Sequence, residues 1–419
     1  MTTRSGALAP LRHRPFRHLM FARAATTLGN AVAPIALAFA VLDLTGSVRD
    51  LGIVVGARSL TNVLFLLFGG VLADRLPRQV VLVVSCVLAA ATQTVVAALV
   101  LTGTATIPLL IVLGAVNGVV SAFALPAAAA LVPQTVPAEL LQPANALNRL
   151  GINAGMIGGA SLGGLLVAGI GPGWGLMVDA GTFALAALAF ARIRVAPLGE
   201  PSSTERVGVF RELREGWGEF IARSWVWTVV LGFLLVNLAQ ASAVNVLGPA
   251  VADATIGRRA WGLVLAAETA GMALGALIAL RLRVRRLLLV GVLCVFGDVP
   301  LLLGLAWAPS FVFLLVTAGL AGIALEQFSV AWETSLQRHI PADRLARVYS
   351  YDALGSFLAI PLGQMAIGPV ALALGTETTL LGAAAIVTLA VLGMLASRGV
   401  RRLDATPAPA PVPERVPTE

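Results

Sequence analysis

The sequence predicts an all-α membrane protein in which twelve transmembrane helices form two pseudo-symmetric six-helix halves. Of the 419 residues, 58% are apolar and only 12% are charged, and the mean hydropathy is +0.91. Soluble chains carry about 25% charged residues, so this composition favours a lipid environment. The apolar residues form long unbroken runs rich in Ala, Leu, Val and Gly. Such runs are typical of spanning helices of about 20 residues rather than of barrel strands.

A repeated segment supports the division into halves. Residues 136–141 (VPAELL) and residues 340–345 (IPADRL) lie about half the chain length apart. The first lies between the fourth and fifth apolar runs, and the second lies between the tenth and eleventh. Because both segments fall in the same loop of their half, they indicate an internal duplication.

The apolar runs define the order of the predicted elements. The spans of the first half are expected at residues 19–43, 50–72, 79–101, 107–131, 147–170 and 174–193. Those of the second half are expected at residues 225–250, 260–280, 287–307, 310–332, 348–374 and 378–397. The chain then consists of a cytoplasmic N-terminal segment (1–18), an N-terminal six-helix half (19–193), a cytoplasmic linker with an amphipathic helix (194–224), a C-terminal six-helix half (225–397) and a disordered cytoplasmic tail (398–419).

The amphipathic helix of the linker is predicted over residues 210–221. Its apolar residues recur at spacings of three and four, at Phe210, Leu213, Trp217 and Phe220. This pattern is typical of a helix that lies in the membrane interface, and a plain solvated linker helix is the alternative. The tail beyond residue 404 is rich in Pro and Ala, which favours disorder.

The arginines predict the orientation of the chain in the membrane. The sequence contains 29 basic residues, and all of them are Arg. If both termini are cytoplasmic, the outer loops contain only Arg49, Arg258 and Arg259, Arg23 and Arg58 lie within the first two spans, and the other 24 arginines lie on the cytoplasmic side. The positive-inside rule therefore predicts a multi-pass protein of the cell membrane with both termini in the cytoplasm.

Composition and residue placement argue against several other functions. The formal net charge is +8, but the arginines lie between apolar runs, so no nucleic-acid partner is expected. Cys86 and Cys294 fall within apolar runs and indicate neither a disulfide framework nor a metal site. A chain without Lys cannot contain a Gly-x-x-x-x-Gly-Lys phosphate loop, which argues against an ATP-driven pump. No nucleophile constellation indicates an enzyme, so no catalytic residue, cofactor or metal is assigned.

The most specific motif lies between the second and third spans, where residues 69–79 read GGVLADRLPRQ. A carboxylate at the C-terminal end of a helix meets an unfavourable dipole, so Asp74 requires a nearby cation or helix N-terminus. Arg75 and Arg78 supply cations, and Gly70 allows a neighbouring helix to approach closely. These four residues are predicted to form a conformational latch that holds one arrangement of two rigid halves.

At this loop the chain resembles the major facilitator superfamily. The motif A of that superfamily has a Gly, an Asp-Arg pair four residues on, a second Gly and basic residues. Here Pro77 replaces the second Gly and Gln79 replaces a basic residue. More closely, the chain is similar to the transmembrane secretion effector and enterobactin-exporter-like branch. The stretches that carry this similarity are residues 16–19 (FRHL), 44–47 (LTGS), 70–75 (GVLADR), 178–180 (VDA) and 332–337 (WETSLQ).

This resemblance implies the major facilitator fold and a monomeric exporter of drugs, siderophores or other natural products, driven by the proton gradient. The partners it implies are a small-molecule substrate, protons and the lipid bilayer. It also implies that the first, fourth, seventh and tenth helices line the transport cavity, whereas the third, sixth, ninth and twelfth lie at the periphery.

Glycines recur every four residues in the fifth predicted span, at Gly151, Gly155, Gly159 and Gly163. A stripe of small residues lets helices pack closely in a membrane. The stripe resembles the antiporter motif C, although Gly158-Gly159 stands in place of the usual Gly-Pro. The pattern is equally compatible with static close packing and with a rocking interface.

Ionisable residues inside spans are candidates for proton coupling or substrate binding, because they are costly to bury in a membrane. Glu268, Asp298 and Glu326 lie in the eighth, ninth and tenth spans. The resemblance makes the ninth helix peripheral, so Glu326 and Glu268 rank above Asp298. Arg58 is the centrally placed cation, and it is expected either to face a carboxylate or anionic substrate or to form a structural ion pair.

Amide side chains form the predicted polar lining of the cavity. They are Asn30, Asn117, Asn237, Gln240, Gln327 and Gln364, with Asn245 as a further candidate. Each of them can instead serve as a hydrogen bond between helices. Asn30 stands where relatives in the resembled branch carry an Asp, which disfavours a proton site on the first helix.

The sequence therefore predicts a secondary active transporter that exports small amphipathic molecules by proton antiport through alternating access. A proton-coupled importer of a small solute is the runner-up, because the same fold and motif A serve both directions. A membrane sensor or scaffold without transport is a third hypothesis, and the shortness of the predicted extramembrane segments argues against it.

Overall fold

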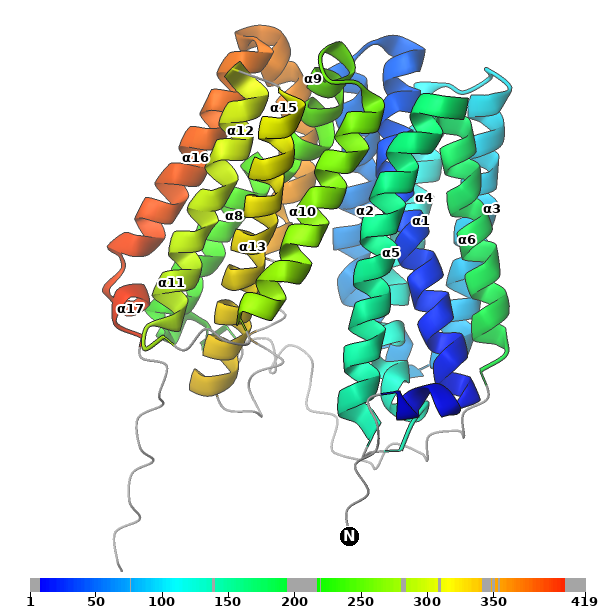
Figure 1. Ribbon diagram of the computed structural model, residues 1–419, viewed down its shortest axis with the longest axis horizontal. Coiled ribbons are helices and arrows are strands. Elements are labelled where there is room, and N and C mark those ends of the chain that lie inside the picture. Colours follow the sequence, from blue (N-terminus) through cyan, green and yellow to red (C-terminus); the bar gives the residue numbers. More distant parts are fainter. Residues whose placement is uncertain are drawn as a thin grey trace, which may run out of the picture.

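The computed structural model describes residues 8–75, 77–137, 140–193, 217–218, 220–279, 284–307, 310–340, 348, 351–352 and 355–403. Within these residues the side chains of 66–75, 125–126, 129–130, 133, 142 and 146 are not described. All regular structure in the described part is helical, and the helices form two groups that stand side by side (Figure 1). Eleven described helices are long and apolar enough to cross a membrane, and α2 adds a further helix of 28 residues. The predicted twelve-helix, two-half fold is thereby confirmed.

The N-terminal half contains six long helices. They are α1 (Arg14–Thr45), α2 (Val48–Arg75), α3 (Arg78–Leu101), α4 (Ile107–Leu131), α5 (Leu141–Ile170) and α6 (Pro172–Ala191). Within this half, α1 packs against α5 and α6, α2 packs against α4, and α3 packs against α4 and α6. Pro near the first helical position starts α1, α4 and α6, where a missing N–H costs no helical hydrogen bond. Gly46, at a φ of 62°, ends α1 in the left-handed conformation.

The C-terminal half has the same number of spans, but two of them are interrupted. One span comprises α8 (Ser224–Ser242), a π-helical turn (Ala243–Leu247) and α9 (Gly248–Ala254). Another comprises α11 (Leu287–Cys294), a 3-10 turn (Val295–Gly297) and α12 (Asp298–Trp307). The remaining helices are α10 (Arg258–Ala279), α13 (Phe311–His339), α15 (Ala359–Leu374), α16 (Thr376–Ala396) and the short α17 (Arg398–Arg402).

Several helices extend beyond the predicted spans because helices do not end where the apolar run ends. The helix expected at 147–170 begins at Leu141, and the helix expected at 310–332 continues to His339. Most of the predicted linker helix and the whole tail beyond residue 403 lie outside the described residues. Of the linker helix, Trp217 and Phe220 are described, and both rings contact Tyr351.

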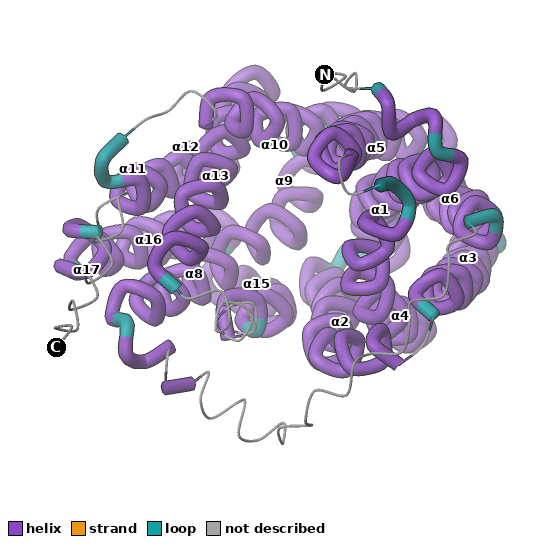
Figure 2. The backbone as a smooth tube through the Cα atoms, turned by 90° about the horizontal axis from the view of Figure 1, so that it is seen from below, coloured by secondary structure: helices purple, strands orange, loops and turns teal. Residues whose placement is uncertain are grey.

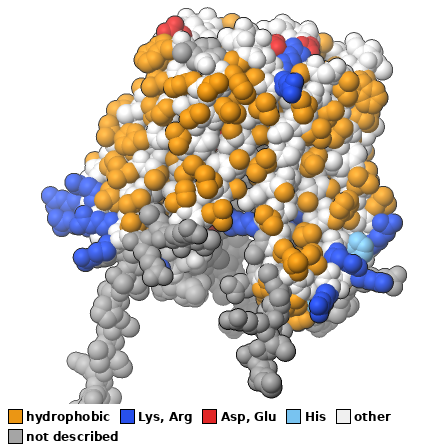
Figure 3. Space-filling model, in the orientation of Figure 1, with side chains coloured by type: hydrophobic (Ala, Val, Ile, Leu, Met, Phe, Trp, Pro, Cys, Tyr) orange, Lys and Arg blue, Asp and Glu red, His pale blue; other side chains and the backbone are white. Residues whose placement is uncertain are grey.

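The described chain begins and ends at the same end of the bundle, which we name the N-terminal face (Figure 1). The opposite end is named the distal face. Apolar side chains cover the flank between the two, and basic side chains gather toward the N-terminal face (Figure 3). Seen along the helices, the two halves lie on either side of a central axis (Figure 2). They contact each other through α5 with α10 and through α2 with α15.

Candidate substrate cavity

A cavity of about 500 Å³ lies between the two halves. Helices α1 and α5 of the N-terminal half and α10 and α13 of the C-terminal half supply its walls. Its lining consists of Arg23, Asn145, Asn148, Arg149, Ile152, Asn153, Met156, Thr269, Met272 and Glu326. Glu326 is 13 residues from the C-terminal end of α13, which lies at the N-terminal face, so it is about 20 Å along the helix from that end. We name this space the central cavity.

One face of α5 supplies most of the polar lining. The lining residues of α5 advance by steps of three and one from 145 to 156, as expected for a single helix face. The side chain of Asn148 is buried, and its Oδ1 accepts no hydrogen bond from the described residues. A buried acceptor without a partner is costly, so a ligand that donates a hydrogen bond would satisfy it.

An ion pair crosses the central cavity from one half to the other. Arg149 Nη2 lies 3.8 Å from Glu326 Oε1, and their side chains are 69% and 10% exposed. Arg149 is on α5 and Glu326 is on α13, so the pair depends on the relative position of the halves. Of the predicted ionisable residues, Glu326 is the one that lines this cavity.

Glu268 and Asp298 lie elsewhere, inside the C-terminal half. Their carboxylates are close enough for the two charges to interact. Asp298 is fully buried, and neither residue is part of the central lining. Residues 269 and 272 of α10 face the cavity instead. The structure thus separates Glu268 from Glu326, although the sequence grouped them.

Arg58 is the centre of a polar network inside the N-terminal half. Its Nε donates to Asn117 Oδ1 at 3.1 Å, and its Nη2 donates to Asn30 Oδ1 at 3.3 Å. Asn117 in turn donates to Thr92. Three of the predicted polar residues are therefore brought together, but within one half rather than between the halves.

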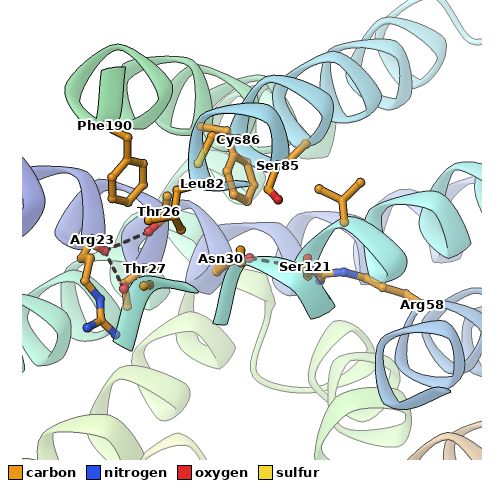
Figure 4. A pocket seen from close by; sticks show the side chains of 15 residues that line it. Arg23, Thr26, Thr27, Asn30, Arg58, Leu82, Ser85, Cys86, Ser121 and Phe190 are labelled. Carbon is orange, nitrogen blue, oxygen red and sulfur yellow. Dashed lines mark hydrogen bonds between the residues drawn. The ribbon is translucent and has the colours of Figure 1, made fainter. Parts of the chain in front are cut away.

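A second cavity of about 300 Å³ adjoins this network, between α1, α3, α4 and α6, with Arg58 of α2 at its edge. Figure 4 shows Arg23 and Arg58 toward opposite ends of this cavity, with Thr26, Thr27 and Asn30 between them. Arg23 also lines the central cavity, so the two spaces share this side chain. Among the described residues, no carboxylate lines the cavity of the N-terminal half.

Asp179 is a buried carboxylate that the sequence reasoning missed as a site candidate. It is 1% exposed, it accepts a short hydrogen bond from Gln93, and its charge interacts with that of Arg58. The signal was present, because Asp179 is an ionisable residue inside a predicted span. The charge of Arg58 thus interacts with that of a carboxylate in its own half.

The remaining amides occupy different places. Gln327 Nε2 donates to the carbonyl of Gly275 at 2.5 Å and joins α13 to α10. Asn237 Nδ2 donates to the carbonyl of Ser356 at 2.8 Å. Gln364 is buried on α15, and Gln240 is half-buried on α8. None of these four is part of the described central lining.

The glycine stripe of α5 faces α1 within the N-terminal half. A Cβ added at Gly155 would lie 2.8 Å from the carbonyl oxygen of Ala24, and one added at Gly163 would lie 3.2 Å from Val32 Cα. Gly151 and Gly159 face the same helix. This position supports static close packing rather than a rocking surface between the halves.

The motif A residues can be placed only in part. Gly70, Asp74 and Arg75 belong to the last turns of α2, and their side chains lie outside the described residues. Arg78 is the first residue of α3. The predicted latch therefore remains a prediction.

The distal face is closed by contacts between the halves. Arg258 of α10 donates to both carboxylate oxygens of Asp43 of α1, and its guanidinium carbon lies 4.8 Å from the ring centre of Phe39. Arg258 also donates to Asp253 of its own half at 2.7 and 3.1 Å. We name these residues the distal ion-pair cluster. Nearby, a Cβ added at Gly262 would lie 2.6 Å from the Cα of Gly164.

The sequence as a whole matches one protein family, described as transmembrane secretion effector, over residues 5–415. The chain belongs to this family of the major facilitator superfamily. It is 26% identical to the multidrug efflux pump Tap of Mycolicibacterium fortuitum, with 88% of this chain and 91% of Tap covered. It is 28% identical to the enterobactin exporter EntS of Escherichia coli, with 94% of each chain covered. The predicted family is confirmed, and the chain is a membrane transporter rather than an enzyme.

Solved structures with the same fold serve different substrates. The nucleoside transporter NupG has a TM-score of 0.70 at 15% identity, and 91% of this chain and 98% of NupG are covered. A bacterial homologue of the human lysosomal transporter Spinster, in an inward-facing and unoccupied conformation, has a TM-score of 0.74 at 16% identity, with 94% and 98% covered. The D-xylose-proton symporter has a TM-score of 0.68 at 15% identity, with 90% and 96% covered. At these identities the likeness establishes the fold alone.

Proposed function

We propose that this transporter exports small amphipathic molecules of the drug, siderophore or natural-product kind by proton antiport, through alternating access of the central cavity. The observation that supports this most directly is the central cavity itself, which lies between the halves and contains both a cross-half ion pair and an unpartnered amide acceptor. The chain aligns over nearly its full length with relatives named as an efflux pump and an exporter, and this favours the export direction.

The proposed topology places the N-terminal face in the cytoplasm, with the linker at 194–224 and both termini on that side. In the described state the distal face is closed by the distal ion-pair cluster. The central cavity lies between the middle of the bundle and the N-terminal face. Substrate then enters from the cytoplasm and leaves after the distal contacts separate.

We assign proton coupling to Glu326. Its carboxylate lines the cavity and faces Arg149 across the boundary between the halves. A proton on Glu326 removes the negative charge that attracts Arg149, so protonation from outside weakens a contact between the halves. Substrate capture from the cytoplasm and proton uptake from outside can therefore alternate at one place. The pair of half-buried Glu268 and buried Asp298 is a second candidate for proton uptake, away from the central cavity.

Import is the competing direction, since the fold also serves a proton symporter. The direction is testable with inside-out membrane vesicles, in which an exporter accumulates its substrate when the lumen is acidified. A panel of drugs and siderophores should yield at least one compound whose accumulation stops when the gradient is collapsed. Glu326→Gln should remove the dependence of accumulation on the proton gradient. Glu377→Gln, which replaces an exposed carboxylate at the start of α16, should leave that dependence unchanged.

Gradient-driven accumulation in right-side-out vesicles alone would mean import. Accumulation that survives gradient collapse would exclude proton coupling. If Glu326→Gln retained the wild-type response and Glu268→Gln lost it, the coupling site would be the Glu268–Asp298 pair.

A further inference from the structure

A third cavity, of about 300 Å³, lies within the C-terminal half. It is bounded by α8, by α13 and by Asp352, Ser356 and Phe357, and we name it the C-terminal-half cavity. Its walls combine the aromatic rings of Phe233, Phe328, Trp332 and Phe357 with the carboxylates of Glu333 and Asp352. Neither Arg nor His lines it among the described residues.

The aromatic wall is built by stacking between helices. The rings of Phe233 and Phe328 are stacked with centroids 3.9 Å apart, and the ring of Trp332 lies nearly parallel to that of Phe328, at 14°. All three rings are buried, whereas Phe357 is 46% exposed. The first three rings form a preformed apolar surface. Because they are held in place on rigid helices, they lose little freedom when a ligand binds.

The two carboxylates are held differently. Asp352 accepts hydrogen bonds from Trp332 Nε1 at 2.9 Å and from Ser356 Oγ at 3.2 Å, which fix its orientation beside the aromatic wall. Glu333 is exposed and forms no hydrogen bond or ion pair with the described residues. One positioned and one unpaired carboxylate beside an aromatic wall are the groups that recognise an organic cation.

The position of Glu333 connects this cavity to the transport route. Glu333 lies seven residues after Glu326 on α13, which is two helical turns on the same face, and their charges interact. Glu333 is therefore about 10 Å closer to the N-terminal face than Glu326 is. A ligand coming from that face would reach the C-terminal-half cavity before the central cavity.

The charged side chains that line the C-terminal-half cavity are opposite in sign to those that line the cavity of the N-terminal half. The cavity of the N-terminal half has the same volume but is lined by Arg23 and Arg58. From this contrast we infer that the C-terminal-half cavity binds an amphipathic aromatic cation, and that such cations are a substrate class of the transporter. The second part of this inference rests on the proposed function, whereas the first does not.

Binding is tested on the full-length protein in nanodiscs of zwitterionic lipid, by isothermal titration calorimetry. The probes are 2-naphthyltrimethylammonium and 2-naphthalenesulfonate, which share a ring system and differ in charge. The cation should bind at least tenfold more tightly than the sulfonate. Glu333→Gln and Asp352→Asn should each weaken cation binding by about tenfold, since each removes a charge from a partly exposed site. Glu377→Gln should leave it unchanged.

Thermal unfolding of each variant checks that the fold persists. Phe357→Ala leaves both carboxylates in place and is measured in the same binding assay as a second variant. Equal affinity for the two probes, or unchanged cation affinity in folded Glu333→Gln and Asp352→Asn proteins, would overturn the inference. If the cation binds as expected but no gradient drives its accumulation in vesicles, the binding site is upheld and the assignment of cations as substrates fails. If other compounds are exported while the cation does not bind, the proposed function stands and this inference is wrong.

Discussion

The distal ion-pair cluster should hold the transporter in the state described here. Asp43→Asn removes the carboxylate that Arg258 reaches across the boundary, while Asp253→Asn removes the one that it reaches within its own half. Both substitutions are nearly isosteric, and each replaces one negatively charged partner of the same Arg258 guanidinium by a neutral amide. They differ in whether the lost contact joins the two halves, so they form a matched pair.

The expected magnitude follows from the exposure of these groups. The side chains of Arg258 and Asp43 are 23% and 42% exposed, so their ion pair contributes about 1 kcal/mol. Asp43→Asn should then shift the equilibrium toward distal opening by about fivefold. Arg258→Gln also loses the contact with Phe39, worth about 0.5–1 kcal/mol, and should shift it by about 10- to 30-fold. Asp253→Asn should change it less than twofold, because no contact between the halves is lost.

The assay is a distance measurement by pulsed electron paramagnetic resonance across the distal face. Spin labels at Thr104→Cys and Glu377→Cys, both exposed and on opposite halves, report the opening once Cys86 and Cys294 are replaced. The longer-distance population should rise in the order wild type, Asp43→Asn, Arg258→Gln. Equal opening in Asp253→Asn and Asp43→Asn would refute the reasoning, because the effect would then come from charge alone. The exchanged pair Asp43→Arg with Arg258→Asp should restore part of the closed population.

Three further predictions concern packing and buried charge. Gly262→Ala places a methyl group 2.6 Å from the Cα of Gly164, so about 1–3 kcal/mol of overpacking should raise the same long-distance population. Gly155→Val acts within one half and should lower the thermal midpoint without changing that population, which the same two measurements would show. Arg58→Met removes the hydrogen bonds to Asn117 and Asn30 together with the charge that interacts with buried Asp179, so it should destabilise the protein by about 1–3 kcal/mol. Adding Asp179→Asn should recover much of this loss in a double-mutant cycle of unfolding free energies.

The membrane-spanning helices could be predicted from sequence because the bilayer leaves the backbone few choices. In lipid every N–H and C=O must find a partner within the protein, so an apolar run long enough to span becomes a helix. This argument predicts the existence of a helix but not its ends. The last seven residues of α13, from Glu333 to His339, are mostly polar and remain helical beyond the predicted span. The interrupted helices at 243–247 and 295–297 also carry no signal in hydropathy.

The candidate site was predicted less completely, because depth in the membrane is readable from sequence and the direction of a side chain is not. Glu268 and Thr269 are adjacent on α10, yet Thr269 lines the central cavity, whereas Glu268 does not and its charge interacts with that of Asp298. The polar face of α5 was overlooked because the glycines of the same helix gave the stronger pattern. Arg149 lies at a predicted span boundary, where an arginine is expected for topology, so its position beside Glu326 could come only from the fold.

Two cross-half ion pairs at different depths suggest how a proton could change the shape of this transporter. The distal pair of Arg258 and Asp43 joins the halves at the distal face, and the pair of Arg149 and Glu326 joins them beside the central cavity. Distal opening must separate Arg258 from Asp43 while the two halves stay in contact elsewhere. The pair of Arg149 and Glu326 must therefore change at a different time from the distal pair, or be replaced by another contact between the halves. A proton on Glu326 abolishes only the second pair, and a bound substrate that contacts both halves can replace it. Under the proposed antiport, exchange of a proton for substrate at Glu326 would change which end of the bundle is held by an ion pair. On that proposal, Arg149→Gln should uncouple transport from the proton gradient while leaving distal closure intact.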